Sequence, residues 1–159
     1  EAGGSVQLGI KNNNFIVKKA NETIIVRLLE GEFPKYEEII AKPEQAIPAL
    51  LDKKAFQKTL RRMSIMSSEN YKGIIFKFDT DRLEIRANNP EIGESKEELE
   101  IEYKGGLIEA AFNPRFFSET LTVVDGDTTT IHLTDSERPC LVEGQEDQRF
   151  LSVIMPMRI

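Results

Sequence analysis

A pattern of one strand, one capped helix and three strands occurs twice between residues 46 and 155 of this chain. Three positions match across an offset of 61 residues: Asp52 with Asn113, Phe56 with Phe117, and Leu60 with Leu121. Asp and Asn favour the start of a helix because their side chains accept hydrogen bonds from free N–H groups of the first turn. One helix can cover only half of such a sheet, so two copies are needed to close a core. The repeat predicts an α+β domain of two βαβββ units, with both helices on one face of antiparallel sheets.

Alternation of apolar and polar residues places the individual elements of the repeat. In the first copy we expect strands at 46–51, 74–79, 83–87 and 99–103, and a helix that follows Asp52 and runs to about Met66. The acidic stretch from Glu91 to Glu102 is expected to lead into the strand at 99–103. In the second copy we expect strands at 107–112, 128–134, 140–143 and 150–155, and a helix with Pro114 in its first turn.

The residues before the repeat have a different organisation. Short β-branched runs at 6–10, 14–19 and 23–28, separated by turn sequences, predict an antiparallel meander. No strand and helix precede them, so they correspond to the last three strands of a further unit. The segment FPKYEEIIAKPEQ carries two prolines and no sustained period, which is typical of a connector. We therefore expect a truncated domain with its connector over 1–37 and a complete domain over 38–159, and we interpret the chain as a fragment.

Composition excludes several classes of protein. The single Cys140 cannot form an intrachain disulfide, and with His132 as the one histidine there are too few ligands for a zinc site. No apolar run approaches the length of a membrane span, and the first ten residues lack the features of a signal peptide. We expect no metal, no cofactor, no membrane association and a reducing, cytoplasmic setting.

The predicted first helix carries a basic face. Residues 52–66 contain five Lys and Arg residues against one Asp, a net charge of +4, whereas the whole chain has a net charge of −6. At 100° per residue, Lys54, Lys58, Arg61 and Arg62 lie opposite Phe56, Leu60 and Met63. Neighbouring like charges cost a few tenths of a kcal/mol, so a face of one sign predicts sequence-independent contact with a phosphate backbone. An ordinary solvated surface is the alternative.

The last ten residues, FLSVIMPMRI, are apolar where a chain terminus is usually polar and frayed. They must either pack as a last core strand or form a surface for a partner. Methionine suits the second role because its unbranched thioether adapts to different shapes, whereas Pro156 prevents the strand from continuing.

The terminal IMPMRI, together with LLEGEFPKYEEII, RANNPE and LTDSERP, resembles the bacterial sliding clamp family, the beta subunit of the replicative DNA polymerase. The resemblance extends over essentially the whole chain and includes the repeat and the basic helix. It implies the DNA-clamp fold and a ring whose helices line the hole, which tethers polymerase to duplex DNA without covalent chemistry. The implied partners are double-stranded DNA, and DNA polymerase subunits, the clamp loader and repair proteins that dock through short peptides bearing a Leu and a Phe.

The resemblance also implies site residues. The implied peptide pocket comprises Pro34, Ile39, Tyr71, Asn113, Phe116, Pro139, Val153, Ile154, Met155, Pro156, Met157 and Arg158. The implied DNA-facing residues are Lys54, Lys58, Arg61 and Arg62, and the implied ring interface comprises Ile65, Met66, Glu94 and Glu97. For Phe116 and Val153, plain core packing is the favoured alternative. Glu38 stands where family members can have a basic residue, which affects peptide preference. Because the other half of domain two is missing, we expect a weakened pocket and a monomeric fragment.

Two other functions remain to be compared with this one. His132, Asp135 and Ser136 are close in sequence, but closeness in sequence does not make the geometry of a catalytic triad, so we do not expect an enzyme. The stronger alternative is a protein–peptide interaction module unrelated to DNA. Such a module would make Lys54 and Arg61 incidental, whereas a clamp predicts that they face the concave side shared with the second helix.

Overall fold

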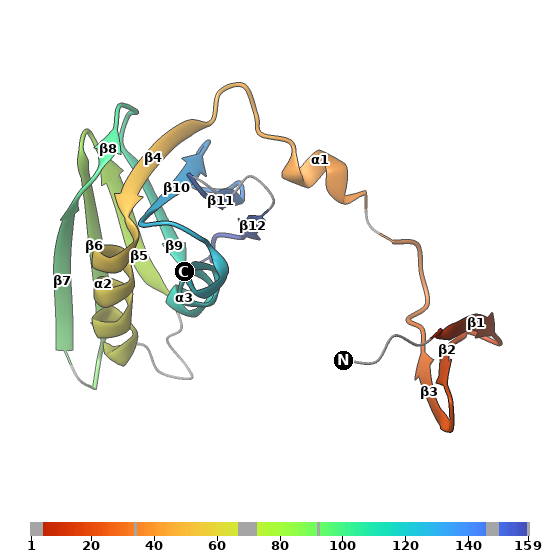
Figure 1. Ribbon diagram of the computed structural model, residues 1–159. Helices are drawn as coiled ribbons and strands as arrows, with labels where there is room; N and C mark the ends of the chain where they lie inside the picture. The colour runs from red at the N-terminus through yellow and green to blue at the C-terminus, as the bar shows by residue number, and fades with distance from the viewer. Residues whose placement is uncertain (1–4, 34, 67–72, 92, 146–149, 159) are drawn as a thin grey trace. The chain divides into compact units, whose positions relative to one another are not determined.

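The structure, a computed structural model, comprises two compact units, Glu1–Lys35 and Tyr36–Ile159 (Figure 1). The residues that it describes are 5–33, 35–66, 73–91, 93–145 and 150–158. The sequence analysis placed the division two residues later, after residue 37.

The first unit is a three-stranded antiparallel sheet in the order β1-β2-β3. Its strands are β1 (Gln7–Lys11), β2 (Asn14–Lys19) and β3 (Glu22–Arg27), which confirms the predicted meander. The apolar side chains of Leu8, Ile10, Ile24 and Ile25 are each at least 60% exposed. Three strands without a covering helix therefore do not close a core.

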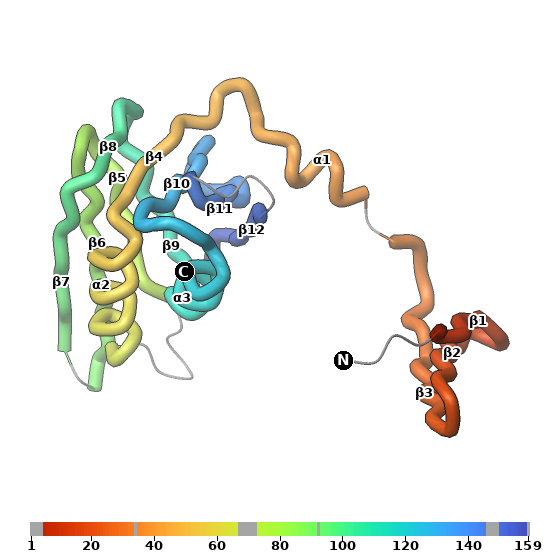
Figure 2. Tube along the Cα trace, in the orientation of Figure 1, coloured from red at the N-terminus to blue at the C-terminus, as the bar shows by residue number. Residues whose placement is uncertain are grey.

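The second unit contains both predicted helices and most of the predicted strands (Figure 2). Its elements are α1 (Tyr36–Ile40), β4 (Ile47–Asp52), α2 (Lys53–Met66), β5 (Ile74–Asp79), β6 (Arg82–Asn89), β7 (Gly93–Glu100), β8 (Glu102–Tyr103), β9 (Ile108–Phe112), α3 (Pro114–Val123), β10 (Thr128–Leu133), β11 (Cys140–Gly144) and β12 (Leu151–Ile154).

Two expectations about these elements were wrong. The predicted connector contains the short helix α1, whose first turn carries Glu37 and Glu38, and negative charge is favourable at a helix N-terminus. The acidic stretch was expected to lead into a strand, but most of it is the strand β7. Its charged residues Lys96 and Glu98 point to solvent and form an ion pair with one another, while Glu97 and Leu99 are partly buried. Charge on the solvent face concealed the alternation that marks a half-buried strand.

The two copies of the repeat exchange their leading strands. The sheets have the orders β12-β11-β10-β4-β8 and β7-β6-β5-β9. β4 of the first copy pairs with β10 of the second, and β9 of the second copy pairs with β5 of the first. Each sheet is therefore completed by a strand from the other copy, which is why neither copy forms a domain alone.

The C-terminal tail occupies the place in the second copy of the repeat that β8 occupies in the first copy. After β12 the Met157 N–H donates a 2.7 Å hydrogen bond to the Ala111 carbonyl and forms a bridge to β9. After β7, Glu102 of β8 pairs with Leu50 of β4. Leu50 and Ala111 are equivalent at the offset of 61 residues, so the tail lies against β9 as β8 lies against β4. The apolar terminus is thus held by a backbone hydrogen bond.

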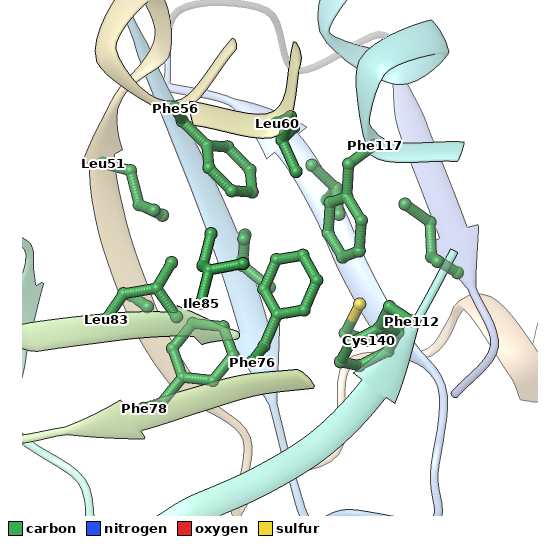
Figure 3. Packing of buried hydrophobic residues seen from close by; sticks show 14 of the residues in the cluster. Leu51, Phe56, Leu60, Phe76, Phe78, Leu83, Ile85, Phe112, Phe117 and Cys140 are labelled. Carbon is green, nitrogen blue, oxygen red and sulfur yellow. The ribbon is translucent and has the colours of Figure 1, made fainter. Parts of the chain in front are cut away.

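The core lies between the two helices and the two sheets (Figure 3). Phe56 of α2 and Phe117 of α3 both contact Phe76 of β5, with ring centroids 6.2 and 5.1 Å away. Phe112 of β9 packs edge-on against Phe76 at 5.3 Å. These rings are buried, and the equivalent positions Phe56 and Phe117 serve both halves of one core.

Candidate functional site

Helix α2 is placed by its cap and by its buried side. The Asp52 carboxylate accepts a 2.6 Å hydrogen bond from the Ala55 N–H, which confirms the predicted cap. Phe56, Leu60 and Met63 are fully buried. The four basic residues of the opposite side, Lys54, Lys58, Arg61 and Arg62, are all exposed. We call these four residues the basic face.

A groove separates α2 from α3, and most of the basic face lines it. The groove has a volume of about 540 Å³ and is lined by Lys54, Gln57, Lys58, Arg61 and Ser64 of α2 and by Ser118 and Thr122 of α3. Positive charge comes from one wall, and the other wall contributes neutral hydroxyl groups. A groove of cations and hydroxyls can bind anionic oxygen atoms by charge and by hydrogen bonds.

Two side chains of α2 hold the helices together beside this groove. Gln57 donates a 3.0 Å hydrogen bond from Nε2 to the Leu121 carbonyl, and Lys53 donates from Nζ to the Val124 carbonyl. Both acceptors lie at the C-terminal end of α3, where carbonyls lack partners within the helix. These bonds set the distance between the helices, so the groove is part of the packed structure.

The four basic residues differ in their partners. Lys54 pairs with Asp127 at 2.8 Å, and the hydrogen bond to Asp127 raises the pKa of Lys54. Arg62 does not line the groove, because its guanidinium group turns to β7 and pairs with Glu97. Within the described residues, Lys58 and Arg61 form no ion pair.

The tail and the start of α3 lie together. Asn113 caps α3 by accepting a 3.0 Å hydrogen bond from the Arg115 N–H. Next to it Phe116 is 49% exposed, so the alternative of core packing does not hold for this residue. Met157 bonds to Ala111, two residues before Asn113. The backbone of the methionine-rich tail is therefore fixed beside β9, the strand that leads into the helix with the exposed Phe116.

The tail residues divide by exposure. Ile154 is buried, Val153, Pro156 and Met157 are half-buried, and Met155 and Arg158 are exposed. The partial burial of Val153 is compatible both with the predicted pocket and with the alternative of core packing. β12 ends at Ile154, two residues before Pro156, as the proline predicts.

Other predicted pocket residues belong to segments that contact or pair with β12. Helix α1, with the exposed Ile39, contacts β12, and Pro139 directly precedes Cys140, which pairs with Ile154. Lys42 holds the segment after α1 against β11 through an ion pair of 2.6 Å with Glu143. Pro34 and Tyr71 lie outside the described residues.

The residues that suggested a catalytic triad have structural partners. His132 Nε2 lies 2.8 Å from a Glu143 carboxylate oxygen, and the Asp135 carboxylate accepts backbone hydrogen bonds from Glu137 and Arg138. These contacts explain both residues as parts of a strand and a turn.

The predicted ring-interface residues occupy the end of α2 and the strand β7. Ile65 is 70% exposed, whereas Met66 packs against the core and accepts a hydrogen bond of 2.9 Å at its carbonyl from Asn89. The Glu94 carboxylate accepts a hydrogen bond of 3.2 Å from Asn88, and the Glu97 carboxylate forms an ion pair with Arg62. Among the described strands, β7 lies at one end of its sheet.

Sequence reasoning missed several groove residues. Gln57 and Ser64 stand at helical spacing from Arg61, so the helical projection contained a signal for them. Ser118 and Thr122 stand four residues apart on α3 and carried the same signal. Asp127 lies in the segment after α3, and no local pattern connects it with Lys54.

In the part of the chain that the structure describes, no helix is both long and apolar enough to cross a membrane.

Comparison with known proteins identifies relatives that all belong to one family. The family model for the DNA polymerase III beta subunit, C-terminal domain, matches residues 38–158. The Beta sliding clamp of Pseudomonas aeruginosa is 30% identical over 159 residues, which is 100% of this chain and 43% of that protein. The Beta sliding clamp of Escherichia coli (strain K12) is 31% identical over 97% of this chain and 41% of that protein. This chain thus spans less than half the length of these relatives.

Solved structures agree with the sequence comparison. The crystal structure of the DNA polymerase III subunit beta from Pseudomonas aeruginosa has a TM-score of 0.81 and 30% identity, over 98% of this chain and 43% of that one. A sliding clamp from the same organism bound to griselimycin has a TM-score of 0.79 and 30% identity, over 98% of this chain and 42% of that one. The antiparallel α+β fold predicted from the repeat is confirmed by this likeness.

Proposed function

The chain belongs to the DNA polymerase III beta subunit family, the beta sliding clamps, and we propose that it forms the C-terminal part of a clamp that tethers polymerase to duplex DNA. In this proposal its role is accessory, without covalent chemistry. Residues 38–159 would be the third domain of the clamp, and residues 1–37 the end of the second. The observation that carries the proposal is the basic face of α2, which is exposed and largely gathered in the groove with α3.

The charge of this face suits a sliding contact. Lys58 and Arg61 are exposed and have no ion-pair partner within the described residues, so both are available to phosphate oxygens. Phosphate contacts carry no sequence information and weaken as salt rises. A few such contacts hold duplex DNA near the helices without fixing it at one sequence.

Charge reversal tests DNA contact. Lys58→Glu combined with Arg61→Glu is expected to abolish the weak binding of a fluorescent 30-base-pair duplex at low salt, measured by anisotropy. Lys104→Glu with Arg138→Glu is the matched control, because it changes the net charge equally at exposed residues outside the groove. Equal binding by the parent and the groove variant would contradict the proposal and favour an interaction module unrelated to DNA.

We place the docking of partner proteins at the tail, with Asn113 and Phe116 beside it. Met155 and Phe116 are about half exposed or more, and flexible methionine and aromatic side chains suit related apolar peptides. The partners in this proposal are polymerase subunits, the clamp loader and repair proteins that carry a short Leu- and Phe-containing peptide. A few buried anchors dominate the affinity of such contacts.

Peptide affinity tests the docking site. Met155→Ala and Arg158→Ala are each expected to weaken binding of a labelled Leu-Phe peptide by about fivefold or more, as contact residues of this kind do. Leu107→Ala is the control, because Leu107 is an equally exposed apolar residue that is not one of the proposed docking residues. If the tail variants bound as tightly as the parent, the docking site would have to lie elsewhere.

We place the joint of the ring at Ile65 and the edge strand β7. Ile65 exposes an apolar side chain, and an edge strand offers unpaired backbone groups to another chain. In a clamp that carries all its domains, Ile65→Glu is expected to shift the sedimentation profile from rings to single subunits. Rings of unchanged stability would contradict this assignment.

A further inference from the structure

Glu97 of β7 holds Arg62 by a closely packed set of hydrogen bonds. Arg62 Nε lies 2.5 Å from Glu97 Oε1, and Arg62 Nη2 donates to Glu97 Oε2. Thr59 donates a further bond of 3.1 Å to the same Oε2. The Glu97 side chain is only 22% exposed, and these bonds lower its pKa, with Arg62 as the main cause. A two-point pair between an arginine and a carboxylate is among the stronger ion pairs in proteins.

Asp127 holds Lys54 at the other end of the basic face. Its carboxylate lies 2.8 Å from Lys54 Nζ, and both side chains are more than 70% exposed. The backbone of Asp127 is anchored, because its carbonyl accepts a 2.9 Å hydrogen bond from the Lys53 N–H. The carboxylate is therefore kept beside the first turn of α2, although the ion pair itself is solvated and weaker than that of Arg62.

These two pairs divide the basic face. Lys54 and Arg62 each have an internal carboxylate, whereas Lys58 and Arg61 form no ion pair within the residues that the structure describes. Phosphates must compete with Asp127 and Glu97 for the first two cations. For the other two they compete only with solvent ions.

We propose, on the premise of the DNA contact proposed above, that Glu97 and Asp127 limit the grip of the basic face on duplex DNA to about two of its four cations. The physical reason is ion exchange. When a free lysine binds a phosphate, a condensed counterion is released from the DNA. A paired cation that stays with its carboxylate releases no counterion, and one that leaves its carboxylate loses an ion pair, which offsets the new contact with phosphate. The two carboxylates keep the contact weak enough for DNA to move past.

The salt dependence of binding counts the cations that contribute. Glu97→Gln and Asp127→Asn, made separately in this chain, are each expected to steepen the slope of log affinity against log salt by about 0.9, the value for one added contact to B-DNA. The measurement is anisotropy of a 30-base-pair duplex over a range of low salt concentrations. Affinity at the lowest salt should rise several-fold.

Matched controls separate local release from general charge. Glu98→Gln removes the same charge from the neighbouring position of β7, where Glu98 faces the opposite side and pairs with Arg82 and Lys96. Asp125→Asn removes a charge two residues from Asp127. Neither control should change the slope. Lys54→Gln in the Asp127→Asn background should remove the gain of the single variant, which identifies Lys54 as the released cation.

The possible results decide between the two proposals. This inference would be overturned if the salt slope were unchanged in both Glu97→Gln and Asp127→Asn, or if the controls steepened it equally. DNA contact through Lys58 and Arg61 would still stand in either case. Binding that is insensitive to Lys58→Glu with Arg61→Glu would overturn DNA contact itself. Glu97→Gln also loosens α2 from β7, so its folding must be checked by circular dichroism, whereas the exposed Asp127 permits the same test without that risk.

Discussion

Phe76 is a residue on which both halves of the repeat depend. Its ring contacts Phe56 of α2, Phe117 of α3 and Phe112 of β9, and it is fully buried. Phe76→Ala is expected to lower the free energy of unfolding by about 3–5 kcal/mol, because it removes apolar contacts and leaves a cavity. Urea denaturation measures this loss. Phe76→Leu, which keeps most of the volume, should cost clearly less, and equal costs would show that the ring contacts, and not the filled volume, account for the loss.

Among the elements, β6 carries a charge cluster that makes the outer face of its sheet sensitive to pH. Glu84 has a side chain that is 8% exposed and pairs with Arg82, Arg86 and Lys96 at 2.8–3.0 Å. The hydrogen bond from Lys96 is the main cause that lowers the pKa of Glu84 below its ordinary 4.5. A lowered folded-state pKa contributes stability above the unfolded value, and that contribution disappears as the pH falls through the folded value.

Glu84→Gln tests this cluster. The variant is expected to be less stable than the parent at pH 7 by about 1–3 kcal/mol, because three cations lose a charged partner. The difference should begin to shrink as the pH falls below about 4.5, where Glu84 of the unfolded parent takes up a proton, and should be lost once the pH has passed the lower pKa of the folded state. Urea unfolding of the parent and the variant at pH 7, 4 and 3 measures this difference in the free energy of unfolding. A difference that stays constant over this range would exclude Glu84 as the titrating group.

For the whole molecule, the division into two units predicts where a protease cuts first. Lys35 ends the first unit and is exposed, whereas Lys42 is held by Glu143. Brief trypsin treatment is expected to cut after Lys35 and leave Tyr36–Ile159 as a resistant product, identified by mass spectrometry. Lys35→Gln should remove this product. If residues within the second unit were cut before Lys35, the two units would not be the separately stable parts of the chain.

Local signals in the sequence were sufficient for most of the elements and for the basic face. Asp52 and Asn113 marked both helix starts, because a cap acts on N–H groups only two or three residues away. The helical projection of α2 placed the exposed cations opposite the buried Phe56, since helix geometry is set by the backbone. β7 was missed because its charged side chains obscured the alternation of a half-buried strand.

The sequence by itself determined most of the segments that become helices and strands, which side of α2 is charged and that the repeat must close one core. The tertiary structure alone decided that β4 and β9 change places between the copies, that the tail bonds to Ala111, and that Glu97 takes Arg62 from the basic face. The physical reason is the range of the forces involved. Caps and periodicity act over a few neighbouring residues, whereas strand pairing and ion pairs join residues whose distance apart is set only when the sheets and helices pack.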